Sequence, residues 1–338
     1  MENMKIALII DTEGWAFDNI AKQIKKHLDN YEIDIIPGRL FEGNMARLFI
    51  FCEQYDLIHF LWRGYLSLID RDEMKEYVEC YFGISFEEFK NKYINNKKIS
   101  FSVCDHLYLR GEEEWRTAEI MKFSNKYIVT SQKLWEIYNN KQIKPTMIIH
   151  DGVDLSRYKP ENLGRFNCNI EKITVGWVGN SKFKDSDNDI DMKGVEGIIK
   201  PAISELQEEG YNIELKLADR NIKMISQEEM PNFYNSIDLY VCASKEEGTP
   251  LTILESMAMG IPVITTDVGI AREAFGQIES DYIMEERSKE CLKNKIKMLL
   301  EHKENLSKMS KENLEQIKQF DWNVICNQYN NFFQNILK

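Results

Sequence analysis

A strand–helix alternation runs through this sequence twice and limits the folds open to it. In the first half, short runs rich in β-branched residues, beginning with KIALII, are separated by helical patterns such as IAKQIKKHL. The strand-like run ITVGWVG then restarts the alternation in the second half. Strands that alternate with helices predict a doubly wound, mostly parallel sheet. Two such series in 338 residues predict two domains.

A loop separates the two series. It runs from Asp154 to Glu171 and carries a proline, a glycine and few apolar residues. We therefore expect the domain boundary in this loop, with a first domain over residues 1–160 and a second over 161–318. The last segment, 319–338, is predicted to be helical after a break at FDWN.

Charge and cysteine usage exclude several classes of protein. The net charge of −12 and the pI near 5.1 argue against a nucleic-acid binder and against broad adhesion to an anionic membrane. The seven cysteines stand singly without a CxxC pair, so neither a disulfide framework nor a zinc site is expected. The first residues lack a signal-peptide pattern, and no apolar run is long enough to span a membrane. We expect a cytoplasmic protein.

The stretch SKEEGTPLTILESMAMGIPVITTDVG holds two glutamates, Glu247 and Glu255, with seven residues between them. The preceding run, DLYVCAS, is a predicted strand, so the Gly-Thr-Pro turn lies at its carboxyl end. The helix that begins near Leu251 then points its amino terminus, a ready phosphate site, at the same crevice. Glu255 could bind two vicinal hydroxyls, such as those of a ribose, and Glu247 the hydroxyls of a sugar. By spacing alone, both glutamates could equally be solvated helix residues.

The whole stretch resembles the E-x7-E signature of retaining glycosyltransferases of family 4. The matching residues are Glu247, Gly248, Pro250, Leu254, Glu255, Met257, Ala258, Gly260, Pro262 and Val263, while Ser256 stands where alanine is usual. HDGVDLSRYKP resembles the family's junction motif, with Asp151 in place of Asn and Tyr158 in place of Phe. DMKGVEGIIKPA resembles the Lys-Gly that opens the first helix of the second domain, and FDWNVICNQY the helix that crosses back to the first.

This resemblance implies an α/β protein of the GT-B class, in which two Rossmann-like domains face a central cleft. Residues 1–160 would bind the acceptor, 161–318 the nucleotide-sugar, and 319–338 would cross back to the first domain. The implied activity is a hexosyltransferase-type transfer, with retention of configuration, from a nucleotide-sugar such as a UDP- or GDP-sugar to a glycan, lipid-linked or small-molecule acceptor. No cofactor or metal is expected, because cations stabilise the diphosphate. Peripheral membrane contact through the N-terminal domain stays open.

The resemblance also assigns site residues. Lys193 matches the Lys-Gly motif, but Asn180 and Ser181 stand where the family commonly has Arg, so Lys182 or Lys184 could substitute. The family histidine of the first domain falls on Cys104 in a strict register, with Asp105 and His106 just after it. The expected catalytic residues are His106, Lys193 and Glu247. The expected donor-binding residues are Gly14, Lys182, Arg220, Gly248, Thr249, Pro250, Leu251, Thr252 and Glu255.

Other interpretations stay open. His59 ends another strand, where packing is the expected role; a structural histidine is also the alternative for His106. DSDNDIDMKGVE places five acidic residues at calcium-loop positions, but Ile190 stands where the loop needs glycine. An acidic loop beside the donor site is therefore favoured over calcium binding. A GT-B epimerase, a phosphorylase and a non-catalytic GT-B binding module remain alternatives to the transferase.

Overall fold

The computed structural model of the chain describes residues 4–41, 44–124, 126–167, 170–183 and 191–338. The chain divides into two compact units. Unit 1 comprises Met1–His150 and Trp322–Lys338, and unit 2 comprises Asp151–Asp321. The chain therefore passes into unit 2 at residue 151, shortly before the loop in which the sequence places the boundary.

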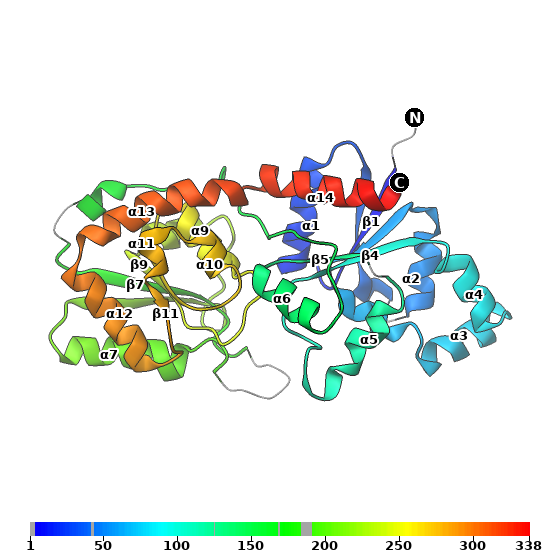
Figure 1. The fold of residues 1–338 in the computed structure, drawn as a ribbon, viewed down its shortest axis with the longest axis horizontal. Helices are drawn as coiled ribbons and strands as arrows, with labels where there is room; N and C mark the ends of the chain where they lie inside the picture. Colours follow the sequence, from blue (N-terminus) through cyan, green and yellow to red (C-terminus); the bar gives the residue numbers. More distant parts are fainter. Residues whose placement is uncertain (1–3, 42–43, 125, 168–169, 184–190) are drawn as a thin grey trace. The chain divides into compact units, whose positions relative to one another are not determined.

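Unit 1 is built on a parallel sheet that, within the described residues, has the strand order β2-β1-β3-β4-β5-β6 (Figure 1). The interior strand β1, between β2 and β3, reads KIALII, and all its residues after the first are buried. Such a run forms a strand covered on both faces, as parallel sheets require. The strands are β1 (Lys5–Ile10), β2 (Glu32–Pro37), β3 (Leu57–Phe60), β4 (Lys98–Val103), β5 (Tyr127–Val129) and β6 (Met147–Ile148).

Helices connect these strands, and local signals fix some of their ends. Ser85 and Glu88 form a reciprocal capping box that starts α4, and Gly83 ends α3 in the left-handed conformation. The helices are α1 (Ala16–His27), α2 (Met45–Phe51), α3 (Asp72–Phe82), α4 (Phe86–Tyr93), α5 (Trp115–Met121), α6 (Gln132–Asn140) and α14 (Trp322–Leu337). Short 3-10 turns are η1 (Gly38–Phe41), η2 (Cys52–Gln54), η3 (Arg63–Leu68) and η4 (Gly111–Glu113).

Helix α14 completes the core of unit 1 although it comes from the far end of the sequence. It contacts α1 and β3, and α1 and α14 lie side by side in Figure 1. One residue of β3, His59, is fully buried and meets Tyr329, Phe332 and Phe333 of α14 edge to face. The apolar side chains of α14 thus cover one face of the sheet.

Unit 2 is a second parallel sheet, with the order β11-β10-β9-β7-β8 among the described residues. Its strands are β7 (Ile173–Gly179), β8 (Ile213–Asp219), β9 (Leu239–Cys242), β10 (Val263–Thr266) and β11 (Ile283–Met284). Its helices are α7 (Lys200–Glu208), α8 (Met230–Asn235), α9 (Leu251–Ala258), α10 (Ala271–Ala274), α11 (Gln277–Ser280), α12 (Lys289–Glu301) and α13 (Glu304–Gln316). A π-helical turn, η6 (Val195–Ile199), precedes α7, and the 3-10 turns are η5 (Leu163–Asn167) and η7 (Ile317–Phe320).

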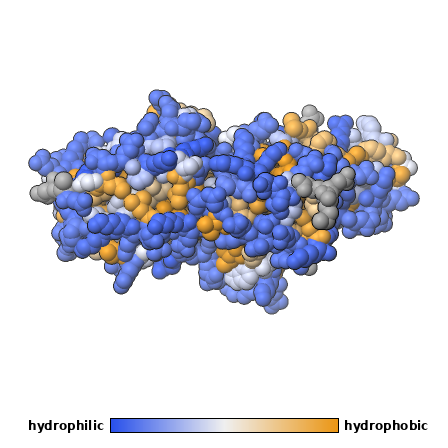
Figure 2. Space-filling view, turned by 90° about the horizontal axis from the view of Figure 1, so that it is seen from above, coloured by the Kyte–Doolittle hydropathy of each residue, from blue (hydrophilic) through white to orange (hydrophobic). Residues whose placement is uncertain are grey.

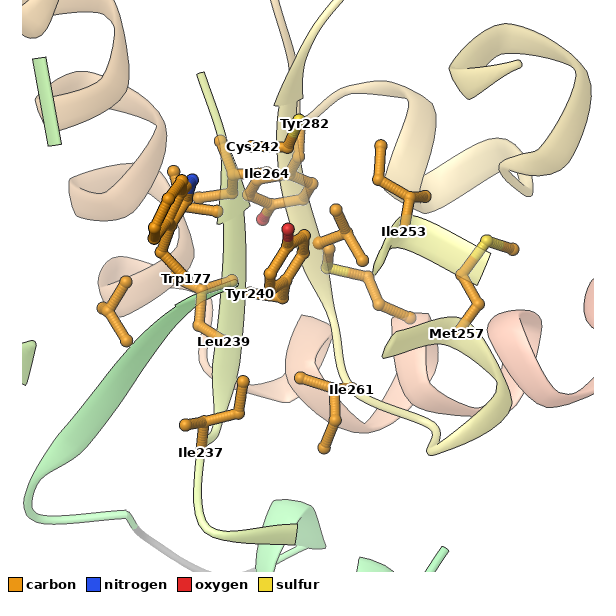
Figure 3. Close-up of a cluster of buried hydrophobic side chains, with 14 of the residues drawn as sticks. Trp177, Ile237, Leu239, Tyr240, Cys242, Ile253, Met257, Ile261, Ile264 and Tyr282 are labelled. Atoms are coloured by element: carbon orange, nitrogen blue, oxygen red, sulfur yellow. The ribbon is translucent and has the colours of Figure 1, made fainter. Parts of the chain in front are cut away.

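The core of unit 2 forms between its sheet and its helices (Figure 3). Trp177 of β7 and Tyr240 of β9 are buried there, with Ile253 and Met257 from the inner face of α9. Each fully buried aliphatic or aromatic side chain contributes roughly 1.5–3 kcal/mol relative to its exposed state. This packing fixes α9, which carries Glu255, against β9 and β10.

The surface is largely polar. Hydrophilic residues predominate on the face in Figure 2, with smaller hydrophobic patches between them. Across the residues that the structure describes, no helix combines the length and apolar character needed to cross a membrane.

The two sheets share one topology, which locates a crevice in each. In unit 2 the first strand, β7, has the second strand, β8, on one side and the third, β9, on the other. In unit 1, β1 lies between β2 and β3 in the same way. Ligands of open parallel sheets bind outside the carboxyl ends of the strands where the order reverses. In unit 2 that point lies beyond Gly179 of β7 and Cys242 of β9.

Candidate functional site

The turn after β9 carries Glu247 and leads into α9. Thr266 at the end of β10 donates from its hydroxyl to the carbonyl of Ser244, at 2.6 Å, and so ties the start of the turn to the sheet. Gly269 backs the turn closely, because a Cβ atom there would lie 2.3 Å from the Gly248 carbonyl oxygen. Pro250 precedes α9 in an extended conformation. The amino end of α9 is therefore fixed close to the carboxyl end of β9, where the sequence predicted it.

A second turn, Asp191–Gly194, docks against the end of β9. Gly194 has φ of 72°, and a Cβ atom there would lie 2.5 Å from the carbonyl oxygen of Ala243, so the approach requires glycine. The amide of Lys245 donates to the Met192 carbonyl at 2.9 Å. This turn places Lys193 beside the loop that holds Glu247.

Arg287 fastens the two turns together. Its Nε donates to the Ala243 carbonyl at 2.9 Å, and its Nη2 donates to the Asp191 carbonyl. A guanidinium suits this role because its planar donors reach two carbonyls at once. Arg287 was not among the predicted site residues, and nothing local in the sequence marks it, since its contacts span 44 and 96 residues.

Lys193 and Glu247, both predicted site residues, form an ion pair between Nζ and Oε1. Their side chains are 22% and 19% exposed. Phe183 lies under the ammonium group, with Nζ 5.2 Å from the ring centroid. The site thus holds a cation, its counter-charge and the amino end of a helix together at one strand end.

Glu255 lies one turn into α9 and is only partly exposed. Its Oε1 accepts a hydrogen bond from the Tyr158 hydroxyl and its Oε2 one from the Tyr234 hydroxyl, each at 2.7 Å. Burial raises the pKa of Glu255, while the two hydroxyls and the nearby Arg157 oppose that rise. Tyr234 was not among the predicted site residues, and Tyr158 was noted only as a departure from the family's phenylalanine.

Asp151 is buried at 3% exposure, where the family motif has asparagine. The hydroxyl of Thr249, from the Glu247 turn, hydrogen-bonds to its carboxyl group. Within the part of the chain that the structure describes, its Oδ1 has no hydrogen-bond partner. Burial raises the pKa of Asp151 to about 7, and the Thr249 hydrogen bond opposes this rise.

The carboxyl ends of β7 and β8 are joined by a polar network around Asp219. Ser181 donates to Asp219 from both its amide and its hydroxyl, and the Asn221 side chain donates to the Asn180 side chain at 2.6 Å. Burial alone would raise the pKa of Asp219, but the hydrogen bonds from Ser181 and Asn221 outweigh it and lower the value. Asn180 and Ser181, which occupy the family's arginine position, therefore bind the neighbouring loop.

Two predicted cations lie near this network. Lys182 is exposed, and its amide donates to the Asn180 side chain at 3.1 Å. Arg220 follows β8 and is exposed, and its backbone amide donates a hydrogen bond to the Gly179 carbonyl. Lys184, the other candidate, lies outside the described residues.

The predicted residues of unit 1 follow its own strands. Gly14 comes after β1 with φ of 78°, and its amide donates to Asp18 at 2.7 Å, so the turn itself requires glycine. His106 is partly exposed in the loop after β4, as is Cys104. The loop is held by the buried Arg63, whose Nη2 donates to Asp105 Oδ1 at 2.6 Å and to the Leu107 carbonyl at 2.7 Å.

His59 has the packing role expected of it. Ser100 and Ser102 hydrogen-bond to its two ring nitrogens, each at 2.9 Å. Burial lowers its pKa to about 3, so the ring is neutral at ordinary pH.

The calcium-loop residues Asp185, Asp187 and Asp189 lie outside the described residues. Asp191, at the end of that motif, accepts from the amides of Glu196 and Gly197 and so caps η6. Where the structure describes the chain, no group of three or more His, Cys, Asp or Glu residues is arranged to hold a metal ion.

Comparison with known proteins places the site in a characterised domain. Residues 191–316 match the family described as Glycosyl transferases group 1. This segment contains Lys193, Glu247 and Glu255. A glycosyl transferases group 1 domain therefore forms most of unit 2.

Two curated relatives match parts of the chain. The lipopolysaccharide core biosynthesis mannosyltransferase LpsB of Rhizobium meliloti is 44% identical over 57 residues, which are 17% of this chain and 16% of LpsB. The O-antigen biosynthesis glycosyltransferase WclY of Escherichia coli is 28% identical over 169 residues, 47% of this chain and 48% of WclY. The matches to these two relatives thus span less than half of each relative's length.

A solved structure covers nearly the whole chain. HepE of Anabaena, in complex with UDP-glucose, superposes with a TM-score of 0.65 over 98% of this chain and all of HepE, at 14% identity. With two parallel sheets in the chain itself, this likeness confirms the expected α/β fold of the GT-B class.

Proposed function

We propose that this protein is a glycosyltransferase that moves a sugar from a nucleoside-diphosphate sugar to an acceptor hydroxyl with retention of configuration. The observation that carries the proposal is the ion pair of Lys193 with Glu247 in the turn that leads into α9, the helix that carries Glu255. They lie at the switch point of a parallel sheet, where such sheets bind ligands. A nucleotide-sugar offers a ribose, a diphosphate and a sugar, and this site offers a matching group for each.

The diphosphate needs positive charge, because it gains negative charge as the sugar leaves. The first N–H groups of α9 and the Lys193 ammonium would supply that charge. Glu247 would accept hydrogen bonds from the hydroxyls of the transferred sugar, and Glu255 from those of the ribose. No metal is part of this proposal, since the helix end and the lysine act on the diphosphate.

The relatives support this class of reaction. LpsB is named a mannosyltransferase and WclY a glycosyltransferase, and HepE binds UDP-glucose. We therefore take UDP-sugars as the first donors to test, with a glycan, a lipid-linked sugar or a small molecule as acceptor. The roles of His106, Gly14, Lys182 and Arg220 stay predictions.

The test begins with a thermal-shift screen of UDP-, GDP- and ADP-sugars, because a ligand that binds the folded state raises the melting temperature. Slow release of the nucleoside diphosphate from the selected donor, in the parent and in Lys193→Ala, then measures sugar transfer to water. We expect release by the parent, unaffected by EDTA, and strongly reduced release by the variant. Absence of binding to every donor would refute the proposal, and a strict Mg²⁺ or Ca²⁺ requirement would refute its metal-free form.

One observation favours a second function, a GT-B module that binds a nucleotide-sugar without transferring it. Asn180 and Ser181 hydrogen-bond to Asn221 and Asp219 where the family has an arginine for the diphosphate. Tight donor binding with no nucleotide release, in water or with acceptor mixtures, would support this function. Sugar-nucleotide interconversion without an acceptor would instead indicate an epimerase.

A further inference from the structure

The carboxylate of Glu255 is held by two phenols from separate elements. Tyr158 belongs to the segment that follows the entry into unit 2, and Tyr234 to α8. Each hydroxyl lies 2.7 Å from a different carboxylate oxygen. The Tyr158 side chain is 5% exposed and that of Tyr234 is fully buried, whereas Glu255 remains partly exposed. The phenols thus hold a carboxylate that solvent still reaches.

The hydrogen-bonding capacity of Glu255 is only half used by these contacts. An ionised carboxylate has about four lone-pair sites on its two oxygens. Among the described residues, the two phenols occupy one site on each oxygen and leave about one open on each. Two remaining acceptors with fixed orientation suit a pair of vicinal hydroxyls.

We propose that Tyr158 and Tyr234 are positioning residues that orient the Glu255 carboxylate toward the two ribose hydroxyls of a bound nucleotide, and thereby set the preference for ribonucleotides over deoxyribonucleotides. This inference rests on the proposed function, and it adds two residues and a specificity to it. Neither tyrosine touches the nucleotide. Phenylalanine would fill the same space at either position, so what the hydroxyls add is the orientation of the carboxylate.

The pKa of Glu255 agrees with this role. Burial raises it, and the hydrogen bonds from Tyr234 and Tyr158, with Arg157, work against that rise. Each phenol therefore favours the ionised form, which is the form that accepts from ribose. Removal of one hydroxyl should raise the pKa of Glu255 further. As the pH is lowered, the variant should therefore lose nucleotide affinity at a higher pH than the parent does.

The experiment compares UDP with 2′-deoxy-UDP by isothermal titration calorimetry, or GDP with 2′-deoxy-GDP if the donor screen selects GDP. The proteins are the parent, Tyr158→Phe, Tyr234→Phe and Glu255→Gln. We expect the parent to prefer the ribonucleotide tenfold or more. The ratio of ribonucleotide to deoxyribonucleotide affinity should fall at least threefold in each tyrosine variant. Glu255→Gln should lose most of the preference. Nucleotide release at saturating donor should change less than donor KM, because the hydroxyls act on ribose binding.

Tyr240→Phe is the matched control. Tyr240 is also buried, and its hydroxyl donates to the same helix, at 2.7 Å from Thr252 Oγ1, rather than to the Glu255 carboxylate. Figure 3 shows Tyr240 within the cluster of buried apolar side chains of unit 2. This variant should keep the parent's ribonucleotide preference even if its melting temperature falls. Equal loss of preference in all three phenylalanine variants would show a general packing effect and overturn the inference.

The result also separates the inference from the function on which it rests. If the parent binds UDP or GDP with the expected preference and both tyrosine variants retain it, the positioning role is wrong and the transferase proposal stands. If the parent binds none of the nucleotides, the transferase proposal falls and takes the inference with it. Because the two tyrosines lie on different elements, each variant tests the role on its own if the other fails to fold.

Discussion

The ammonium group of Lys193 is paired with the carboxylate of Glu247, and this pair joins the turn before η6 to the turn after β9 across 54 residues of sequence. Each partner also has an expected role toward the donor. A diphosphate that reaches Lys193 must compete with Glu247 for the same cation. We infer that donor binding exchanges one anionic partner of Lys193 for another and frees Glu247 for the sugar.

Glu247→Gln should therefore bind the nucleoside diphosphate more tightly while it transfers sugar more slowly. A partly exposed ion pair contributes up to about 1 kcal/mol, so the affinity gain should be roughly fivefold. Calorimetry with UDP or GDP measures the gain, and nucleotide release measures the loss. Glu246→Gln removes the same charge from the same turn and should produce neither change. Weaker diphosphate binding by Glu247→Gln would contradict the competition.

Lys193→Ala should reduce turnover roughly a hundredfold or more, the loss expected when one preorganised donor to the transition state is removed. Nucleoside affinity should fall less, since the proposed contact of Glu255 with the ribose is untouched. Steady-state kinetics separate the two effects. Lys200→Ala removes an exposed cation that pairs with Glu196 and serves as the control. An equal loss of turnover in both variants would point to an effect of net charge rather than to a role of Lys193.

Gly194→Ala should disturb the site through the backbone. The left-handed conformation costs a non-glycine residue roughly 1–2 kcal/mol, and the new Cβ atom would also meet the Ala243 carbonyl oxygen at 2.5 Å. Displacement of Lys193 by even about 1 Å should lower turnover by one to two orders of magnitude.

Gly210→Ala isolates the conformational cost. Gly210 has φ of 91°, but a Cβ atom there would meet nothing within 4 Å. It should lower the melting temperature and leave turnover intact. If Gly194→Ala behaves in the same way, the close approach to Ala243 does not position the lysine.

Asp151→Asn should stabilise the protein at alkaline pH. The carboxyl has a pKa of about 7 in the folded chain and near 3.8 when unfolded, so the folded state retains a proton that the unfolded state releases. The free energy of unfolding therefore decreases as pH rises from about 4 to 7. Above pH 7 the total decrease is up to about 4 kcal/mol. Asparagine removes this penalty and can still accept from Thr249.

Melting temperatures of the parent and Asp151→Asn at pH 4, 6 and 8 check this prediction. The difference should be near zero at pH 4 and grow with pH. Thr249→Val, which removes the donor and keeps the carboxyl group, should lower the melting temperature most at pH 8. A difference that is independent of pH would show that Asp151 is not protonated in the folded state.

Strand and helix periodicity predicted the fold well, because each buried strand is a local run of apolar residues. The sequence also predicted a strand, then a turn with Glu247, then a helix with Glu255. The structure has the same order in β9, the turn after it and α9. It did not predict that Lys193 pairs with Glu247. That contact depends on how two turns dock, and Gly194 was the only local sign of close approach.

The partners of Glu255 were missed for a similar reason. Tyr158 lies 97 residues away and Tyr234 lies 21 residues away, and neither spacing carries a periodic signal. Arg287 was missed because its partners are backbone carbonyls, which every residue has. Contacts of this kind depend on tertiary packing, whereas secondary structure follows from local pattern.

The position of α14 has a consequence for synthesis. The helix that covers His59 and its sheet in unit 1 is encoded after all of unit 2. At about 5–20 residues per second, the ribosome needs on the order of ten seconds or more to add the intervening segment. During that time the apolar face under α14 is without its cover and open to chaperones and to other nascent chains. Unit 1 is thus synthesised first and completed last. A chain truncated before α14 would have its defect in unit 1, most of which is encoded at the other end of the sequence.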